Sequence, residues 1–552
     1  MAAHKPVEAQ PKKRPPFPYK FYFYFAGGYY LVMWILWFRG QYGDDWSAFL
    51  SVFVFFTALY NVLRGLFAYD YYRDEVALHK LVLESTHTDG KARFATFNEL
   101  KQRGMDKPGL FLGSLEGKHI FYPGETHLLT ISPPGGGKGT GIVVPNLLLY
   151  PGSMIVTDPK GELFAITAKH RENRLGHKII VLCPWADKLS RELGIQIPDH
   201  GFNPLSIIQP GTDIKDEAEL ISSLLLPAGA NMKADDEFWI EGGQSILTAF
   251  MLHIRSEEEK VGPLTLPLLR QYLHLPPEEL TAVLFAMSKN EAFGGCIREY
   301  GGKLLGTMER SPKQFEGLLG SAQKALRIYD SISPLGNHVS RGEIDFTSLK
   351  REPTTIYLIM PSDRGHTHAA WLNLVMSLAV ELVGRDRSNR RVLFLLDEMA
   401  NMGYMPNILR AMAQYRGQGL QVWSIIQQLA QLEKLYGKSG STQFVGTCEM
   451  INTFGVWDPE TIEFISKWLG QTTVRNGTFQ VSKMPNPGDV ADVNYSMTDK
   501  AFTLMRPEDI RTMGDHEQLI FYRNLAPIKA ERIHYYQNPA LSKWAEPNPY
   551  RR

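Results

Sequence analysis

Two uncharged apolar segments near the N-terminus constrain this chain most strongly. They read FYFYFAGGYYLVMWILWF over residues 21–38 and WSAFLSVFVFFTALYNVL over residues 46–63. At about 1.5 Å of rise per residue, a helix of either length is close to the roughly 30 Å hydrocarbon layer of a membrane. A buried hairpin of core helices is the weaker interpretation, because such helices are seldom apolar on every face. The sequence therefore predicts a two-helix transmembrane anchor over residues 21–63.

Charges on the flanks of these segments indicate their orientation. Lysine and arginine are frequent in residues 1–20, whereas the connection 39–45 holds one arginine and two aspartates. Cytoplasmic flanks are enriched in Lys and Arg, so we expect both ends in the cytoplasm and residues 1–20 to be a cytoplasmic tail. A signal peptide is disfavoured, because the first segment lacks a small-residue cleavage site and a second segment follows at once.

The remaining composition is that of an ordinary globular protein. Lys plus Arg number 59 against 58 for Asp plus Glu, which excludes a strongly basic nucleic-acid coat and an acidic scaffold. The three cysteines, Cys183, Cys296 and Cys448, are far apart. Their spacing favours neither a disulfide framework nor a structural zinc site.

Short apolar runs alternate with helical stretches through much of the soluble part. These runs are HLLTI (127–131), SMIVTD (153–158), KIIVLC (178–183), TTIYLIM (354–360), VLFLLDE (392–398) and LQVWSII (420–426). Continuous rather than alternating apolar strands are typical of a parallel sheet covered on both faces. We therefore predict an α/β domain in two parts, residues 127–212 and 346–552.

The other regions lack this pattern. Residues 213–345 have Leu and Ala at helical spacing, which predicts an all-α domain inserted into the α/β domain. Residues 64–126 are interpreted as a connector to the α/β domain, with short strand-like pieces at 90–96 and 109–113. The last dozen residues are expected to form an untied tail.

A glycine-rich loop follows the first of the predicted strands. SPPGGGKGTG (132–141) is followed by a helix-compatible stretch, so successive N–H groups would cradle phosphates at a helix N-terminus, with Lys138 reaching the β and γ phosphates. Ser132 replaces the first glycine of the usual GxxxxGK[ST] pattern, and Gly139 replaces its magnesium-binding hydroxyl. Thr140 is the nearby hydroxyl and the candidate magnesium ligand. The candidate nucleotide-binding residues are Pro134, Gly135, Gly136, Gly137, Lys138, Gly139 and Thr140.

Two adjacent carboxylates end another predicted strand. Asp397 and Glu398 follow VLFLL, where P-loop NTPases place a magnesium-binding carboxylate and a residue that aligns or deprotonates the attacking water. Neither this pair nor the glycine-rich loop is specific alone. Together, and in this order, they predict ATP hydrolysis with Mg²⁺.

Two further residues are candidates for the same chemistry. Gln427 follows the strand 420–426 and could sense the γ-phosphate, although a surface glutamine in a Gln-rich run is an equal alternative. Arg416 precedes that strand and could act across a subunit boundary as an arginine finger; a solvated arginine is again an equal alternative.

The ordered motifs resemble one known family. After the two apolar segments come GKARFAT, PPGGGKGTGIVVPNLL, TDPKGEL, GFNPL, DEFW, LLDEMANMG and IIQQLAQL. This set is similar to that of the type IV secretion coupling proteins, the TraG-like ATPases, over essentially the whole chain.

The resemblance implies a RecA-like motor domain with an all-α insertion, assembled as a homo-hexamer at the bacterial inner membrane. In it Lys138 would bind phosphate, Asp397 magnesium, and Glu398 would be the catalytic base, with Gln427 and Arg416 assisting. It also implies partners: the inner-membrane components of the secretion system, relaxase–DNA complexes or effector proteins, and single- or double-stranded DNA bound without sequence specificity.

Two alternatives to this coupling ATPase remain. A nucleotide-switched cargo receptor with little turnover is motivated by the imperfect phosphate loop. An FtsK-like DNA translocase is disfavoured, because such translocases typically have four spans and a basic winged-helix end.

Overall fold

The computed structural model describes residues 92–550 apart from 230–233, 343, 389 and 482–492, together with a few residues between 27 and 60. Contacts divide the chain into two units, residues 1–88 with 474–500 and residues 89–473 with 501–552. In the predicted anchor 21–63, the described residues are helical, and the rest of the anchor, like the tail 1–20, lies outside the described residues.

Among the described residues, one helical stretch is long and apolar enough to cross a membrane. It is Ser362–Arg385, and 72% of its most apolar window is buried. That burial is expected of a core helix of the second unit.

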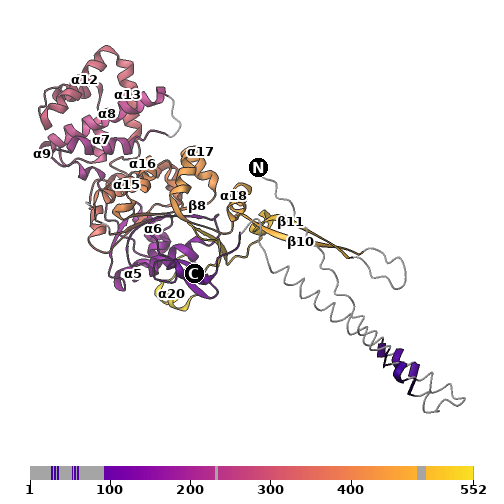
Figure 1. Ribbon diagram of the computed structural model, residues 1–552. Coiled ribbons are helices and arrows are strands. Elements are labelled where there is room, and N and C mark those ends of the chain that lie inside the picture. The colour runs from indigo at the N-terminus through magenta and orange to yellow at the C-terminus, as the bar shows by residue number, and fades with distance from the viewer. Residues whose placement is uncertain are drawn as a thin grey trace. The chain divides into compact units, whose positions relative to one another are not determined.

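An eleven-stranded sheet organises the second unit, with the strand order β2-β1-β13-β12-β9-β3-β8-β7-β4-β6-β5 (Figure 1). All neighbouring pairs from β9 to β5 are parallel, and those from β2 to β9 are antiparallel. The strands are β1 (Leu110–Leu115), β2 (Lys118–Tyr122), β3 (His127–Ile131), β4 (Ser153–Asp158), β5 (Lys178–Leu182), β6 (Thr354–Ile359), β7 (Val392–Leu396), β8 (Leu420–Ile426), β9 (Cys448–Thr453), β12 (Glu517–Tyr522) and β13 (Ile528–Glu531). The six strands predicted from apolar runs are confirmed as β3 to β8.

Helices cover both faces of this sheet. Alternate strand residues enter different cores: Leu129 lies in one apolar cluster and Leu128 in the other. α15 and α16 pack into the first cluster, and α4, α5 and α6 into the second (Figure 1). The helices outside the all-α region are α3 (Phe97–Gln102), α4 (Val144–Leu149), α5 (Glu162–Asn173), α6 (Ala186–Leu193), α15 (Gly365–Arg385), α16 (Pro406–Gln414), α17 (Leu429–Thr447), α18 (Pro459–Leu469), α19 (Pro507–Arg511) and α20 (Pro539–Trp544).

Between α6 and β6 the described chain contains α-helices and no strand. They are α7 (Ile214–Leu225), α8 (Ala234–Ser256), α9 (Glu258–Val261), α10 (Leu266–Leu273), α11 (Pro277–Met287), α12 (Cys296–Arg310), α13 (Pro312–Ala325) and α14 (Pro334–His338). α8, α12 and α13 pack against one another (Figure 1). A separate two-stranded sheet pairs β10 (Gln471–Val481) with β11 (Val493–Thr503).

The structure differs from the sequence-based expectation at both ends of the second unit. Residues 110–122, assigned to a connector, form β1 and β2 of the main sheet. The expected untied tail was wrong, because Asn548 donates to Glu162 and the Tyr550 hydroxyl donates to the Lys160 carbonyl at 2.9 Å.

A buried polar chain fixes the register of the central strands. The Trp423 indole N–H donates to the Thr130 hydroxyl at 2.8 Å, and that hydroxyl donates to Asn452 at 2.5 Å. Asn452 donates to Gln518 at 3.4 Å, and Gln518 donates to the Leu112 carbonyl. Buried polar groups are costly when unpaired, so this series of hydrogen bonds favours one alignment of β8, β3, β9, β12 and β1.

Candidate functional site

The glycine-rich loop leaves the carboxyl end of β3 and enters a helix. Gly135 and Gly137 adopt positive φ values of 79° and 82°, a conformation that costs other residues strain. Lys138 opens the helical turn, which is a π-helix over Gly139–Val143 before α4 begins. A glycine-rich turn that leads directly into a helix is the backbone arrangement found at anion sites.

Lys138 brings the predicted phosphate-binding and catalytic residues together. Its Nζ lies 3.1 Å from Glu398 Oε1 and 3.5 Å from Asp397 Oδ1, although the lysine is 260 positions from Glu398 in the sequence. Glu398 has a positive φ of 56°, an uncommon conformation for a non-glycine residue. Strain of this kind gathers at functional sites, and the Asn401 amide holds the other Glu398 oxygen at 2.7 Å.

Asp397 is the buried member of the carboxylate pair. Its Oδ1 accepts no hydrogen bond, and burial raises the pKa of its carboxyl while the Lys138 ammonium opposes that rise. A buried oxygen without a hydrogen bond is costly unless a ligand reaches it, so this atom fits a magnesium ligand. Among the described residues no group of three acidic, His or Cys side chains could hold a metal. One or two carboxylates suffice for Mg²⁺ when phosphates and water complete its shell.

Thr140 lies in the loop but its hydroxyl points to other partners. It donates to the Gly137 carbonyl at 3.2 Å and bonds to His534 Nδ1 at 2.8 Å. The Thr140 hydroxyl is therefore engaged by its own loop and by His534.

Gln427 and Arg416 lie at opposite ends of β8. β8 pairs with β3 and β7, so Gln427, which follows its last residue, lies at the edge that carries Lys138 and Asp397. Arg416 is exposed in the turn η7 (Arg416–Gln418) that precedes β8, at the amino ends of the strands. The structure therefore brings Gln427 to the site edge and places Arg416 away from it.

Sequence reasoning missed the residues that brace the loop. β13 runs in the same direction as β3, and Arg532 follows its end, donating to the Gly136 carbonyl and to the Asp515 carbonyl. The guanidinium carbon of Arg532 lies 3.9 Å from the Phe454 ring centroid. His534 contacts the same loop. The basic and aromatic segment RIHYY (532–536) after the last strand is the sequence feature that could have indicated these residues. Nothing in its spacing links it to a loop almost four hundred residues earlier.

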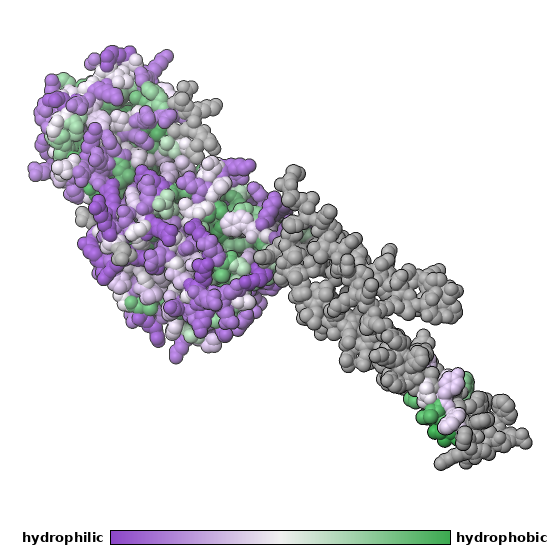
Figure 2. All heavy atoms as spheres, viewed as in Figure 1, coloured by the Kyte–Doolittle hydropathy of each residue, from purple (hydrophilic) through white to green (hydrophobic). Residues whose placement is uncertain are grey.

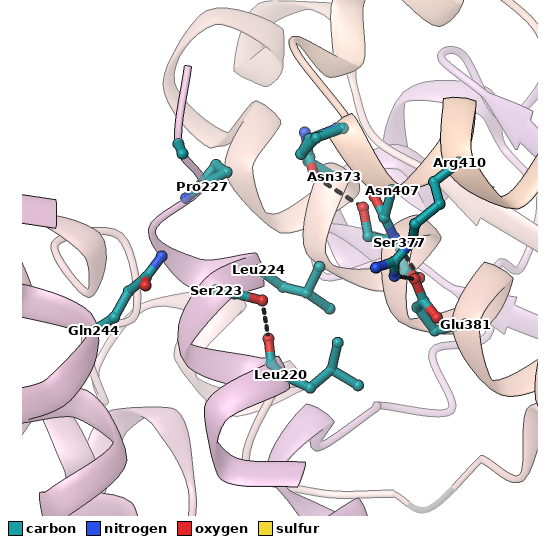
Figure 3. Close-up of a pocket in the computed structure, with 12 residues that line it drawn as sticks. Leu220, Ser223, Leu224, Pro227, Gln244, Asn373, Ser377, Glu381, Asn407 and Arg410 are labelled. Carbon is teal, nitrogen blue, oxygen red and sulfur yellow. Dashed lines mark hydrogen bonds and ion pairs between the residues drawn. The ribbon is translucent and has the colours of Figure 1, made fainter. Parts of the chain in front are cut away.

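A separate hollow of about 290 Å³ lies where α7 and α8 meet α15 and α16 (Figure 3). Figure 3 shows Asn373, Ser377 and Glu381 of α15 facing Leu220 and Leu224 of α7. It contains none of the predicted site residues. Asn373 also donates to the carbonyls of Met402 and Tyr404, which follow Glu398, so this junction is linked by hydrogen bonds to the segment after the carboxylate pair.

Comparison with known proteins gives a consistent result. Residues 86–549 match the family model "Type IV secretory system Conjugative DNA transfer". Protein VirD4 of Rhizobium radiobacter is 24% identical over 485 residues, covering 83% of this chain, and the chain spans only 65% of that protein's length. A conjugal transfer protein TraG of Escherichia coli is 25% identical over 478 residues, covering 79% of this chain and 71% of TraG.

Solved structures share the fold at lower identity. The unbound bacterial conjugative coupling protein TrwBdeltaN70 superposes with a TM-score of 0.60 at 16% identity, covering 83% of this chain and 96% of that one. TrwB in complex with the ATP analogue ADPNP gives a TM-score of 0.59, also at 16% identity, with 82% and 95% covered. The second unit therefore shares the fold of TrwB, with a mostly parallel sheet.

The two left-handed glycines of the loop provide a matched test of its geometry. A Cβ at Gly137 would lie 2.9 Å from His534 Cε1 and 3.0 Å from Arg532 Nη1, whereas one at Gly135 meets nothing within 4 Å. Both alanine variants bear the left-handed cost of about 1–2 kcal/mol. We expect Gly137→Ala to lower nucleotide affinity roughly tenfold more than Gly135→Ala, because only Gly137→Ala adds an unfavourable contact with segment 532–536. Calorimetric titration with ADP measures both affinities. Equal losses of ADP affinity in the two variants would show that Arg532 and His534 do not shape the loop.

Gly139 provides a second test, because it stands where the usual loop carries a hydroxyl. Its helical conformation and open surroundings admit a Cβ without contact. Gly139→Ser should therefore raise ADP affinity in Mg²⁺ by roughly fivefold, the scale of one polar contact, with no gain in EDTA. Gly139→Ala is the control and should gain nothing. An equal gain in both variants, or a serine variant that gains as much in EDTA, would contradict magnesium binding beside this position.

Proposed function

This chain belongs to the type IV secretory system conjugative DNA transfer family, and we propose that it is a membrane-anchored coupling ATPase that passes substrate to a type IV secretion channel. The observation that carries this proposal is the meeting of Lys138 with Asp397 and Glu398 at the carboxyl edge of the sheet. A cation on a phosphate loop beside two carboxylates is the minimum set for phosphoryl transfer to water.

In the proposed mechanism Lys138 exchanges partners. Its ammonium leaves Glu398 for the β and γ phosphates of ATP, where it offsets their negative charge. Glu398 is then free to accept the proton of the attacking water as the general base. Asp397, whose Oδ1 accepts no hydrogen bond and lies 3.5 Å from the Lys138 ammonium, would hold Mg²⁺, which supplies charge stabilisation on the phosphates when bound. Gln427 lies at the same edge and would contact the γ-phosphate.

Arg416 fits this mechanism only across a subunit boundary. It lies at the amino ends of the strands, away from Lys138 of its own chain, and it is exposed. A ring built by head-to-tail contacts would bring residues of one subunit next to the site of its neighbour. We therefore propose a homo-hexamer in which Arg416 stabilises the transferring phosphoryl group in trans.

The names of the relatives support the proposed substrates. TraG of Escherichia coli is named as a conjugal transfer protein, and VirD4 of Bartonella quintana as a type IV secretion system-coupling protein. We propose relaxase–DNA complexes, effector proteins or both as cargo, and inner-membrane secretion components as partners. Contacts to DNA would track its phosphates without sequence preference, and they would weaken steeply with salt.

The proposed location is the bacterial inner membrane, with residues 21–63 as a two-pass anchor and the motor in the cytoplasm. The described helical residues there expose apolar side chains such as Leu31, Ile35 and Phe55, whereas the face of the second unit seen in Figure 2 is mostly hydrophilic. Exposed apolar side chains on helices are what a lipid environment requires.

A second candidate function is a cargo receptor that binds nucleotide as an assembly switch with little turnover. It is favoured by Gly139 at the hydroxyl position and by the bond that holds the Thr140 hydroxyl to His534. In that case ATP would change the oligomeric state without appreciable phosphate release.

Substrate transfer from a donor bacterium tests the coupling function. Lys138→Ala and Glu398→Gln should each lower transfer at least roughly a hundredfold, the scale of losing a general base, while membrane insertion persists. Lys434→Ala and Glu433→Gln make the same changes at exposed positions of α17 and should transfer normally. Normal transfer by both site variants would exclude a coupling role for this site.

A further inference from the structure

Two aromatic rings form a stack on one side of the phosphate loop. The rings of His534 and Tyr536 have centroids 5.4 Å apart and an interplanar angle of 13°. His534 lies against the loop itself, with its Cε1 2.9 Å and its Nδ1 3.6 Å from where a Cβ would stand on Gly137 and Gly141. The outer ring, Tyr536, is 43% exposed. An aromatic stack with one ring on the loop and one reaching solvent thus adjoins the phosphate site.

This stack is fixed to the loop by hydrogen bonds. His534 Nδ1 bonds to the Thr140 hydroxyl at 2.8 Å, and the Tyr535 N–H donates to the Thr140 carbonyl at 3.0 Å. Two residues earlier, Arg532 donates to the Gly136 carbonyl. Because these contacts hold segment 532–536 against the loop, the Tyr536 ring is positioned before any ligand arrives, which lowers the entropic cost of binding.

The two ends of the site differ in chemistry. Lys138 points toward Asp397 and Glu398. In the proposed function this end of the site binds the terminal phosphates and the metal. His534 touches Gly137, Thr140 and Gly141, next to the start of the helix that follows the lysine. A phosphate chain cradled by the loop therefore has its charged end at Lys138 and can present its organic end to segment 532–536.

Building on the proposed function, we propose that Tyr536, supported by His534, is the stacking platform for the purine base of the bound nucleotide. Aromatic rings attract a base through its π-face, and a parallel stack of two rings can extend to a third. Every base has such a face, so adenine and guanine nucleotides bind with similar affinity. Tyr536 is then a nucleotide-positioning residue outside the glycine-rich loop and the carboxylate pair.

Trp457 is the competing aromatic residue. Trp457 is 72% exposed and follows β9. Gly455, two residues before it, lies close to the loop, because a Cβ placed on Gly455 would be 3.7 Å from Gly136 Cα. Its place near the beginning of the loop makes it the natural comparison for Tyr536.

The test is calorimetric titration of the full-length protein in detergent with ADP, GDP and inorganic tripolyphosphate, each with Mg²⁺. Tyr536→Ala should raise the Kd for ADP and GDP about tenfold, the scale of one lost base–aromatic stack, and leave that for tripolyphosphate unchanged. Tyr536→Phe keeps the ring and should bind as the unsubstituted protein does, and Trp457→Ala should bind both nucleotides normally.

Several outcomes would overturn the platform. They are an unchanged Kd for ADP in Tyr536→Ala, an equal loss for tripolyphosphate, which would indicate a distorted loop, and a loss of nucleotide affinity in Trp457→Ala alone. If the unsubstituted protein binds neither ADP nor tripolyphosphate, the proposed function itself fails, and the platform fails with it.

Discussion

The contact between one ammonium group and two carboxylates is the constraint on which this structure depends. Asp397 is buried at a strand end with an oxygen that accepts no hydrogen bond, and Glu398 is held in a left-handed conformation. Burying a charged or polar group without partners is costly, and the cation of Lys138 offsets that cost while no phosphate is present. In the proposed mechanism the nucleotide phosphates bind the same ammonium group, so they compete with the two carboxylates for Lys138.

The fold brings these groups together through the order of its strands. β3 carries the loop, β7 carries the carboxylates, and β8 lies between them, so the carboxyl ends of three neighbouring strands supply the site. The polar chain from Trp423 to Leu112 holds β8, β3, β9, β12 and β1 in register beneath it. Arg532, from the end of β13, then braces the loop from the antiparallel side of the sheet.

Strands β3 to β8, the glycine-rich loop and the carboxylate pair could be predicted from the sequence, because buried strands are distinctive in sequence. Strands β3 to β8 are covered on both faces, so they are continuous apolar runs, and the loop and carboxylates stand out where these runs end. β9 escaped prediction because its buried residues include Asn452 and Thr453, which break the apolar run. The roles of Arg532 and His534 and the anchoring of Tyr550 could not be predicted, since each depends on a contact between residues far apart in sequence without a periodic pattern.

Whether the Lys138 site hydrolyses ATP can be measured as phosphate release by the full-length protein in detergent, with and without single-stranded DNA and beside Lys138→Ala. We expect turnover that single-stranded DNA stimulates and that Lys138→Ala abolishes, because the ammonium at the loop stabilises the charge of the transferring phosphoryl group. Turnover that persists unchanged in Lys138→Ala, or verified hexamers that release no phosphate, would contradict it.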